Sequence, residues 1–179
     1  MERPEIGEVV YTEEQIRSKV GDLARRITED YREGAEGSPL LLIGILKGAF
    51  IFLADLARLI DVPLEFDFMA ISSYGSATKT SGVVRILKDL DKDITGRHVL
   101  LVEDIIDTGL TLNYLLRSLT ARGPASLEIC ALLNKQVANK VELPVKYEGF
   151  SIPDVFVVGY GLDCAESYRN LPYIASVKK

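Results

Sequence analysis

The sequence predicts an α/β protein built on a mainly parallel, twisted sheet flanked by helices. Continuous apolar runs bounded by turn residues, such as "LLLIGIL" at residues 40–46, are typical of strands covered on both faces. Segments with helical spacing lie between these runs, and such alternation favours parallel strands joined by right-handed crossovers. With 179 residues, 47% of them hydrophobic and 26% charged, the chain suits one globular domain with its own core.

Two helices and a further strand are expected next to the run at 40–46. Thr12 and Gln15 form a capping box, and the helix that follows is closed by Gly34. A second helix is expected at 49–60, and "VPLEFDFMAI" that follows it is typical of a strand. The apolar positions that recur at helical spacing in the first helix are Ile16, Val20, Leu23, Ala24, Ile27 and Tyr31.

The second half of the chain continues the alternation after a long hairpin. Small polar residues at 72–82 precede a strand-like segment at 83–90, which predicts the hairpin. A buried strand is then expected at 97–105, followed by a helix at 110–122 that stops at Gly123. Further strands are expected at 125–134, 145–150 and 154–161, before an irregular C-terminal tail.

Charge and composition exclude several classes of function. The net charge of −5 gives no basic footprint for a nucleic-acid backbone. Cys130 and Cys164 have no CxxC or histidine partner, so we expect reduced thiols and no zinc site, and the single His98 disfavours a Ser-His or Cys-His triad. No long uncharged apolar run and no signal peptide are evident, so we expect a cytoplasmic protein without a membrane segment.

Three carboxylates follow one of the buried strands, in the stretch "HVLLVEDIIDTGLTLNYLL" at 98–116. In an open parallel sheet, ligands bind outside the carboxyl ends of the strands, which is where Glu103, Asp104 and Asp107 are expected. An ordinary strand end, with acids favouring the dipole of the next helix, is the alternative interpretation.

The turn after these acids has the composition of a phosphate cradle. Gly109 can adopt a positive φ, and Thr108 and Thr111 offer hydroxyls beside the free N–H groups that open the next helix. Acids beside such a cradle would repel the anion unless they bind a sugar diol, a divalent cation and a reacting proton. The pattern therefore predicts a phosphorylated sugar as ligand.

These residues also carry a resemblance to a known family. "VLLVEDIIDTGLTL" at 99–112 resembles the phosphoribosyl pyrophosphate (PRPP) motif of the phosphoribosyltransferases, in the form of the hypoxanthine-guanine branch. "LKGAF" at 46–50 is similar to the pyrophosphate loop of that branch, and "SSYG" at 72–75 to its mobile loop. The base-binding and C-terminal segments are matched at 153–163 and 168–174. The nucleotide-binding motifs GxxxxGK[ST] and GxGxxG are absent from the sequence.

The resemblance implies a role for each acid. Glu103 and Asp104 would contact the ribose hydroxyls and Mg²⁺, and Asp163 would be a further carboxylate on the metal side, acting through water. Asp107 would face N7 of the purine and accept its proton.

The phosphate contacts are implied in the same way. Thr108, Gly109, Leu110 and Thr111 would clamp the 5′-phosphate with their amides and hydroxyls, although Leu110 replaces a lysine that some relatives carry. The pyrophosphate contacts implied are Lys47 and Gly48, after a cis peptide between Leu46 and Lys47, together with Arg169. Without the resemblance, Lys47 could equally be a solvated loop lysine.

The mobile loop, at roughly 70–84, would contribute Ser73 and Tyr74, although an ordinary hairpin tip explains its composition as well. On the base side, Lys135 would contact the 6-oxo group of an oxopurine. Phe156 would stack on the base, Val157 would read its edge through the backbone, and Ile105 would pack on the other face. From the sequence pattern alone these apolar residues would be assigned to the core.

The resemblance as a whole implies a purine salvage enzyme. Its reaction would be the Mg²⁺-dependent transfer of the phosphoribosyl group of PRPP to hypoxanthine or guanine, giving IMP or GMP and pyrophosphate. It also implies a single domain over 1–179, with a hood formed by the N-terminal segment and roughly 135–179, in a homodimer or homotetramer. The alternatives are a transferase for another base, such as xanthine or a pyrimidine, and a regulatory nucleic-acid-binding protein on the same fold.

Overall fold

The computed structural model describes residues 5–32, 38–74, 83–135 and 141–178. Its centre is a six-stranded sheet with the strand order β4-β3-β2-β5-β6-β7. All neighbouring strands run parallel except β4, which pairs antiparallel with β3, so the α/β prediction is confirmed. The strands are β2 (Leu40–Leu46), β3 (Leu64–Tyr74), β4 (Val83–Lys88), β5 (His98–Ile106), β6 (Ser126–Asn134) and β7 (Tyr147–Ser151).

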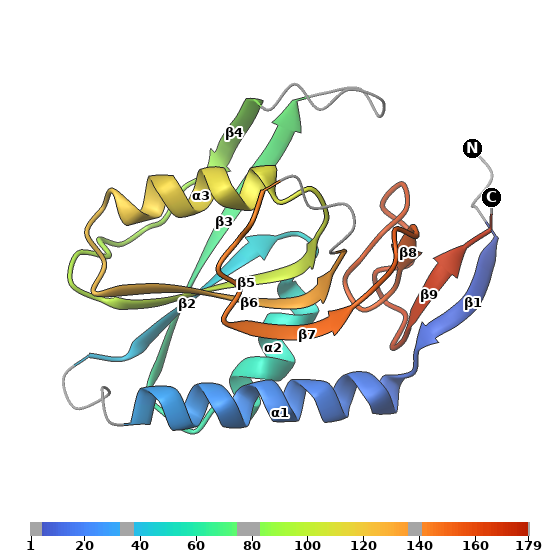
Figure 1. Ribbon diagram of the computed structural model, residues 1–179, viewed down its shortest axis with the longest axis horizontal. Coiled ribbons are helices and arrows are strands. Elements are labelled where there is room, and N and C mark those ends of the chain that lie inside the picture. Colours follow the sequence, from blue (N-terminus) through green and yellow to red (C-terminus); the bar gives the residue numbers. More distant parts are fainter. Residues whose placement is uncertain (1–4, 33–37, 75–82, 136–140, 179) are drawn as a thin grey trace.

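Helices cover both faces of this sheet (Figure 1). Helices α1 (Glu13–Arg32) and α2 (Phe50–Leu59) lie on one face, and α3 (Leu110–Thr120) lies on the other. Neighbouring residues of β2 point to opposite faces, because Leu42 packs in the core with α1 and α2 while Ile43 packs in the core with α3.

The first helix begins as its sequence predicts. The Thr12 amide donates to Oε1 of Gln15 over 2.9 Å, and the Gln15 amide donates to Oγ1 of Thr12 over 3.3 Å, so the capping box is confirmed. All six apolar positions expected to face the core are buried. Gly34, expected to close this helix, lies outside the described residues. No helix in the described ranges is both long and apolar enough to cross a bilayer.

A second, three-stranded sheet has the order β1-β9-β8, and its strands are β1 (Ile6–Tyr11), β8 (Val157–Val158) and β9 (Ile174–Val177). The expectation of an irregular C-terminal tail was therefore wrong, since β9 pairs antiparallel with both other strands. The strand expected at 154–161 is reduced to β8, because Gly159, Tyr160 and Gly161 have φ values of 99°, 51° and 102°, which are incompatible with extended backbone. Strand β7, within the stretch assigned to the hood, pairs with β6 in the large sheet.

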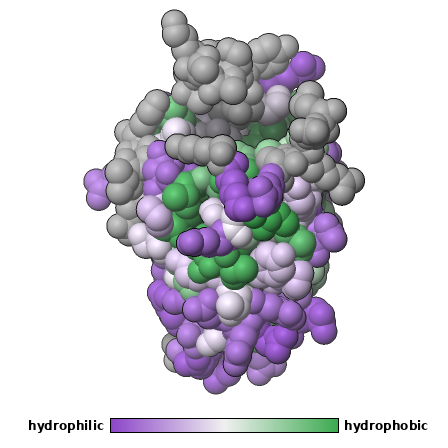
Figure 2. All heavy atoms as spheres, turned by 90° about the vertical axis from the view of Figure 1, so that its right-hand side faces the viewer, coloured by the Kyte–Doolittle hydropathy of each residue, from purple (hydrophilic) through white to green (hydrophobic). Residues whose placement is uncertain are grey.

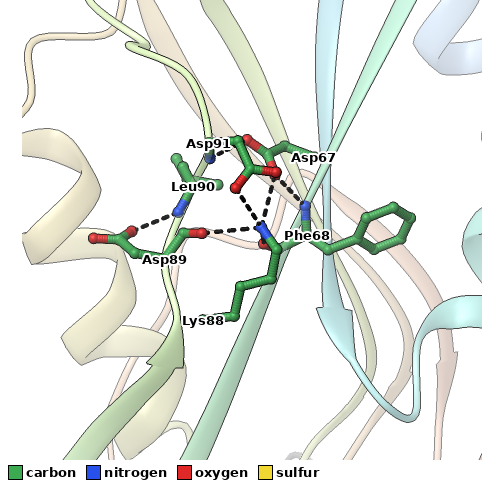
Figure 3. Close-up of polar contacts among 6 residues, drawn as sticks. All are labelled: Asp67, Phe68, Lys88, Asp89, Leu90 and Asp91. Carbon is green, nitrogen blue, oxygen red and sulfur yellow. Dashed lines mark hydrogen bonds and ion pairs between the residues drawn. The ribbon is translucent and has the colours of Figure 1, made fainter.

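The β3–β4 hairpin is anchored at its base by a buried carboxylate (Figure 3). Asp67 on β3 accepts hydrogen bonds from the amides of Phe68 (2.7 Å) and Asp91 (2.8 Å). The ammonium of Lys88 lies 3.4 Å from the same carboxylate and donates to the Phe68 carbonyl over 3.1 Å. The ladder between the two strands has an irregularity between Ala70 and Ile71, next to this cluster. The cluster thus fixes the point from which the hairpin extends.

Candidate active site

The carboxyl ends of β2, β5 and β6 open onto a cavity of about 320 Å³. Because these strands are parallel neighbours, the residues that follow them gather at one edge of the sheet. Figure 2 views the molecule from the side toward which these strand ends point, where apolar surface is interspersed with polar side chains. The cavity is lined by Lys47, Gly48, Asp104, Ile105, Asp107, Lys135, Phe156, Val157, Leu162, Asp163 and Arg169.

A second hollow, of about 160 Å³, adjoins the first and is lined by the turn at the end of β5. Thr108, Gly109 and Thr111 line it together with Glu103, while Ile105 and Asp107 line both hollows. The tip of β5 thus forms part of the wall of both hollows.

The turn in the smaller hollow exposes backbone donors. Gly109 has a φ of 76°, in the left-handed region, and α3 begins directly after it at Leu110. The first amides of a helix have no partner within the helix and carry its positive dipole end, so this turn can bind an anion. Leu110 belongs to this turn, although its side chain does not line either of the two hollows in the described structure.

Glu103 and Asp104 are neighbouring carboxyl groups on β5, of which Glu103 is partly buried and Asp104 is buried. Burial and, next to it, the charge of Asp104 raise the pKa of Glu103 well above its usual range. Burial likewise raises the pKa of Asp104 to about 6, against the opposing hydrogen bond from the Ile105 amide. Oε2 of Glu103 is buried and has no hydrogen-bond partner among the described residues. Such a pair would be stabilised in its charged form by a cation or by hydroxyl donors of a ligand.

This donor set fits Mg²⁺, which prefers hard carboxylate oxygens. No three His, Cys, Asp or Glu side chains within the described ranges converge into a complete metal cage. A metal ion held by Glu103 and Asp104 would therefore need further oxygens from a ligand, as is usual where Mg²⁺ accompanies a substrate phosphate.

The loop after β2 is packed tightly against the acids. The peptide between Leu46 and Lys47 is cis, as expected. A Cβ added to Gly48 would overlap the carboxylate of Asp104, and a Cβ added to Gly161 would overlap the carbonyl oxygen of Gly48. The loop is thus held between the tip of β5 and the segment that follows β8.

The two cations near this loop share a carboxylate that the sequence did not single out. Oε2 of Glu166 lies 3.1 Å from Nζ of Lys47 and 3.5 Å from a guanidinium nitrogen of Arg169. Arg169 also pairs with Asp163 over 2.7 Å and donates to the Gly161 carbonyl over 2.8 Å. The hydrogen bond from Lys47 is the main reason why the pKa of Glu166 is lowered. A lone Glu in a polar stretch gave no sequence pattern by which to find it.

The base side of the larger cavity brings together a buried cation and an exposed ring. The Lys135 side chain is only 9% exposed, and its ammonium lies 3.7 Å from Oδ1 of Asp107. Phe156 is 57% exposed and lines the same cavity as Ile105 and the buried Val157. A planar ligand between these apolar groups could meet Lys135 and Asp107 at its polar edge.

Ser73 and Tyr74 lie in the last part of β3, where they pair with Val84 and Val83. The rest of the predicted mobile loop, residues 75–82, lies outside the described residues. Since β3 is parallel to β2, it ends at the same edge of the sheet as the cavity.

Comparison with known proteins agrees with this geometry. The model of the phosphoribosyl transferase domain family matches residues 10–165. The hypoxanthine-guanine phosphoribosyltransferase of Mycobacterium avium is 55% identical over 97% of this chain and 86% of its own length. The hypoxanthine phosphoribosyltransferase of Escherichia coli K12 is 52% identical over 95% of this chain and 94% of its own.

A crystal structure of a hypoxanthine-guanine phosphoribosyltransferase from Bacillus anthracis superposes with a TM-score of 0.90 at 49% identity. The superposition covers 97% of this chain and 100% of that one. With the matched domain spanning most of the sequence and relatives this similar over nearly its whole length, this chain belongs to the phosphoribosyl transferase family.

Proposed function

We propose that the chain is a Mg²⁺-dependent purine salvage enzyme that transfers the phosphoribosyl group of PRPP to hypoxanthine or guanine. The products would be IMP or GMP and pyrophosphate. The observation that carries the proposal is the gathering of Glu103, Asp104 and Asp107 at one strand tip, between a hollow with free helix amides and a larger, partly apolar hollow. The first hollow suits a sugar phosphate and the second suits a purine with pyrophosphate beside it.

On the base side, Asp107 accepts the proton from N7 of the purine as the base attacks the sugar, because a less protonated base is the better nucleophile. Lys135 donates to the 6-oxo group, which disfavours adenine because its 6-amino group is itself a donor. Phe156 and Ile105 enclose the ring, and the backbone of Val157 reads its edge. The support is the position of these five residues around one cavity.

On the sugar side, Glu103 and Asp104 hold the ribose hydroxyls, and residues 108–111 bind the 5′-phosphate through their amides and hydroxyls. Oε2 of Glu103, which has no hydrogen-bond partner in the described part of the chain, supports this role. Ser73 and Tyr74 also contact PRPP in this proposal, because β3 ends at the edge of the sheet that carries the cavity.

On the pyrophosphate side, Lys47 and Arg169 stabilise the charge that develops on the leaving group, and the Gly48 backbone lies beside it. When bound by Glu103, Asp104 and, through water, Asp163, Mg²⁺ supplies positive charge that favours departure of pyrophosphate. The residues of the chain position the reactants and place positive charge next to the leaving group, where negative charge develops.

We also propose one domain over residues 1–179, with β1, β8 and β9 forming the hood over the cavity. The exposed Phe50 and Leu59 on α2 offer apolar area for a second copy, in a homodimer or homotetramer. A cytoplasmic location follows from the same proposal, because free cysteines suit a reducing compartment.

The proposal is tested by absorbance-monitored turnover of hypoxanthine, guanine, xanthine and adenine with PRPP and Mg²⁺. We expect turnover of hypoxanthine or guanine and at least about 100-fold less of adenine, whose amino group leaves the buried Lys135 donor unmatched. Turnover restricted to xanthine or a pyrimidine would favour the alternative transferases. An absence of turnover together with a salt-dependent gel shift of RNA or DNA would favour a nucleic-acid-binding protein.

A further inference from the structure

The ammonium of Lys135 is shared between two carboxylates that come from different parts of the chain. It donates a hydrogen bond to Oδ1 of Asp154 over 3.2 Å, while Oδ1 of Asp107 lies at 3.7 Å, beyond hydrogen-bond distance. Asp154 lies in the segment between β7 and β8 and is 66% exposed, whereas Lys135 is buried. The proposed reaction gives roles to Lys135 and Asp107 but none to Asp154.

Two backbone hydrogen bonds tie Lys135 and the residue before it to neighbouring segments. The Lys135 amide donates to the Ile106 carbonyl over 2.9 Å, which ties it to β5. The carbonyl of the preceding Asn134 accepts from the Ile152 amide over 2.9 Å, which ties it to the segment that leads to Asp154. Asp107, just after β5, and Asp154, just after the segment tied to β6, thus approach one ammonium from two sides of it in the sequence.

We propose that Asp154 is a positioning and specificity residue that holds the Lys135 ammonium away from Asp107. This inference rests on the proposed function. A carboxylate in direct contact with an ammonium retains its negative charge more firmly and is a poorer proton acceptor. By accepting the closer hydrogen bond, Asp154 leaves Asp107 free to take the proton of the base and keeps Lys135 directed at the 6-oxo position.

The test is Asp154→Asn in the full chain, assayed beside the wild type with hypoxanthine, guanine and adenine. We expect kcat/KM for hypoxanthine to fall roughly tenfold, because the variant impairs but does not remove acid–base catalysis. The KM for PRPP should stay within about twofold, since the PRPP groups are untouched. The acidic limb of the pH–rate profile should move to lower pH, because Lys135 would then pair with Asp107.

Three further variants separate positioning from a general structural role. Asp154→Glu restores a carboxylate and should recover most of the activity and the pH profile. Asp61→Asn alters an exposed carboxylate at the opposite edge of the sheet and should match the wild type. In a Lys135→Met background, Asp154→Asn should have no further effect, because the two residues act as a unit.

The outcomes distinguish this inference from the proposed function. An inactive wild type would overturn the function itself. With an active wild type, the inference is overturned if Asp154→Asn has an unchanged kcat/KM, or if it loses activity without a change in the pH profile. It is also overturned if the effect persists undiminished in the Lys135→Met background.

Discussion

Gly48 packs so closely against the carboxylate of Asp104 that a methyl group at position 48 would overlap it. Gly48→Ala must therefore displace either Asp104 or the loop that carries Lys47. Because both contribute to the proposed PRPP site, we expect kcat/KM for PRPP to fall by at least about 100-fold, as small misplacements at a reacting centre do. Steady-state kinetics at varied PRPP would measure the loss.

Gly21 provides the matched control, since a Cβ there meets nothing within 4 Å and the residue lies in α1. Gly21→Ala should keep full activity and raise the free energy of unfolding by about 0.5–1 kcal/mol, because alanine is the better helix former. If Gly48→Ala retained the activity of Gly21→Ala, the close packing at Asp104 would have no functional importance.

Asp107→Ala removes the proposed proton acceptor. We expect kcat to fall by about 10²–10⁴ while the protein stays folded, since the side chain is 57% exposed and lies at the mouth of the cavity. Single-turnover kinetics with hypoxanthine, alongside a thermal unfolding curve, would measure both quantities. Wild-type turnover in this variant would exclude Asp107 from proton transfer.

Asp67→Asn tests the anchor of the β3–β4 hairpin. The side-chain NH₂ group of asparagine would face a backbone N–H group of Phe68 or Asp91, and two donors cannot form a hydrogen bond. We therefore expect a loss of about 1–3 kcal/mol in the free energy of unfolding at pH 7. Burial alone would raise the pKa of Asp67, but hydrogen bonds from Phe68, Asp91 and Lys88 outweigh it and lower the pKa below 3.8.

The sign of the pH dependence follows from this lowered pKa. The stabilisation by the charged group is complete above about pH 4, the usual pKa of an unfolded Asp, and is lost as the pH falls through the lower folded value. Denaturant titrations should therefore show the gap between wild type and Asp67→Asn narrowing below pH 4. Asp91→Asn, which changes a 75% exposed partner of Lys88, should cost less than about 1 kcal/mol. Equal stability of the wild type and both variants at pH 7 would contradict the proposal that Asp67 anchors the hairpin.

Glu166→Gln should strengthen the binding of pyrophosphate. The carboxylate of Glu166 occupies Lys47 and Arg169, the two cations proposed to receive that anion. Because all three groups are at least partly exposed, we expect a modest effect, with inhibition by pyrophosphate roughly two- to fivefold tighter. Product-inhibition kinetics would measure it, with Glu14→Gln on the exposed start of α1 as the control. Weaker inhibition would show that Glu166 supports the binding of pyrophosphate rather than competing with it for Lys47 and Arg169.

The local periodicity of the sequence was sufficient for most of the large sheet and its helices. The capping box at Thr12 and the unbroken apolar run of β2 depend only on neighbours in sequence, and both are confirmed. The tip of β5 could be located as well, because a strand followed by acids and a glycine turn is a local pattern. The placement of Lys135 and Phe156 around it came from the resemblance.

Features that depend on distant partners could not be predicted in this way. Strands β1 and β9 are short and pair across most of the chain, so neither carries a strong pattern of its own. Nothing in the sequence distinguishes Glu166 and Asp154 from acids on the protein surface. Only the fold brings Glu166 to Lys47 and Asp154 to Lys135. The glycine-rich turn after β8 shortened the expected strand because its backbone is left-handed.

The pairing of β1 with β9 brings together the first and last strands of the described structure, and the Lys178 amide donates to the Glu5 carbonyl over 3.0 Å. Strand β9 in turn holds β8, which carries Val157 at the wall of the larger cavity. Trimming or bulky tagging ahead of Tyr11 would consequently loosen a wall that is built from residues nearly 150 positions later in the chain. A circular permutant that links Glu5 to Lys178 through a short bridge would preserve this wall, because the pairing of β1 with β9 would stay intact.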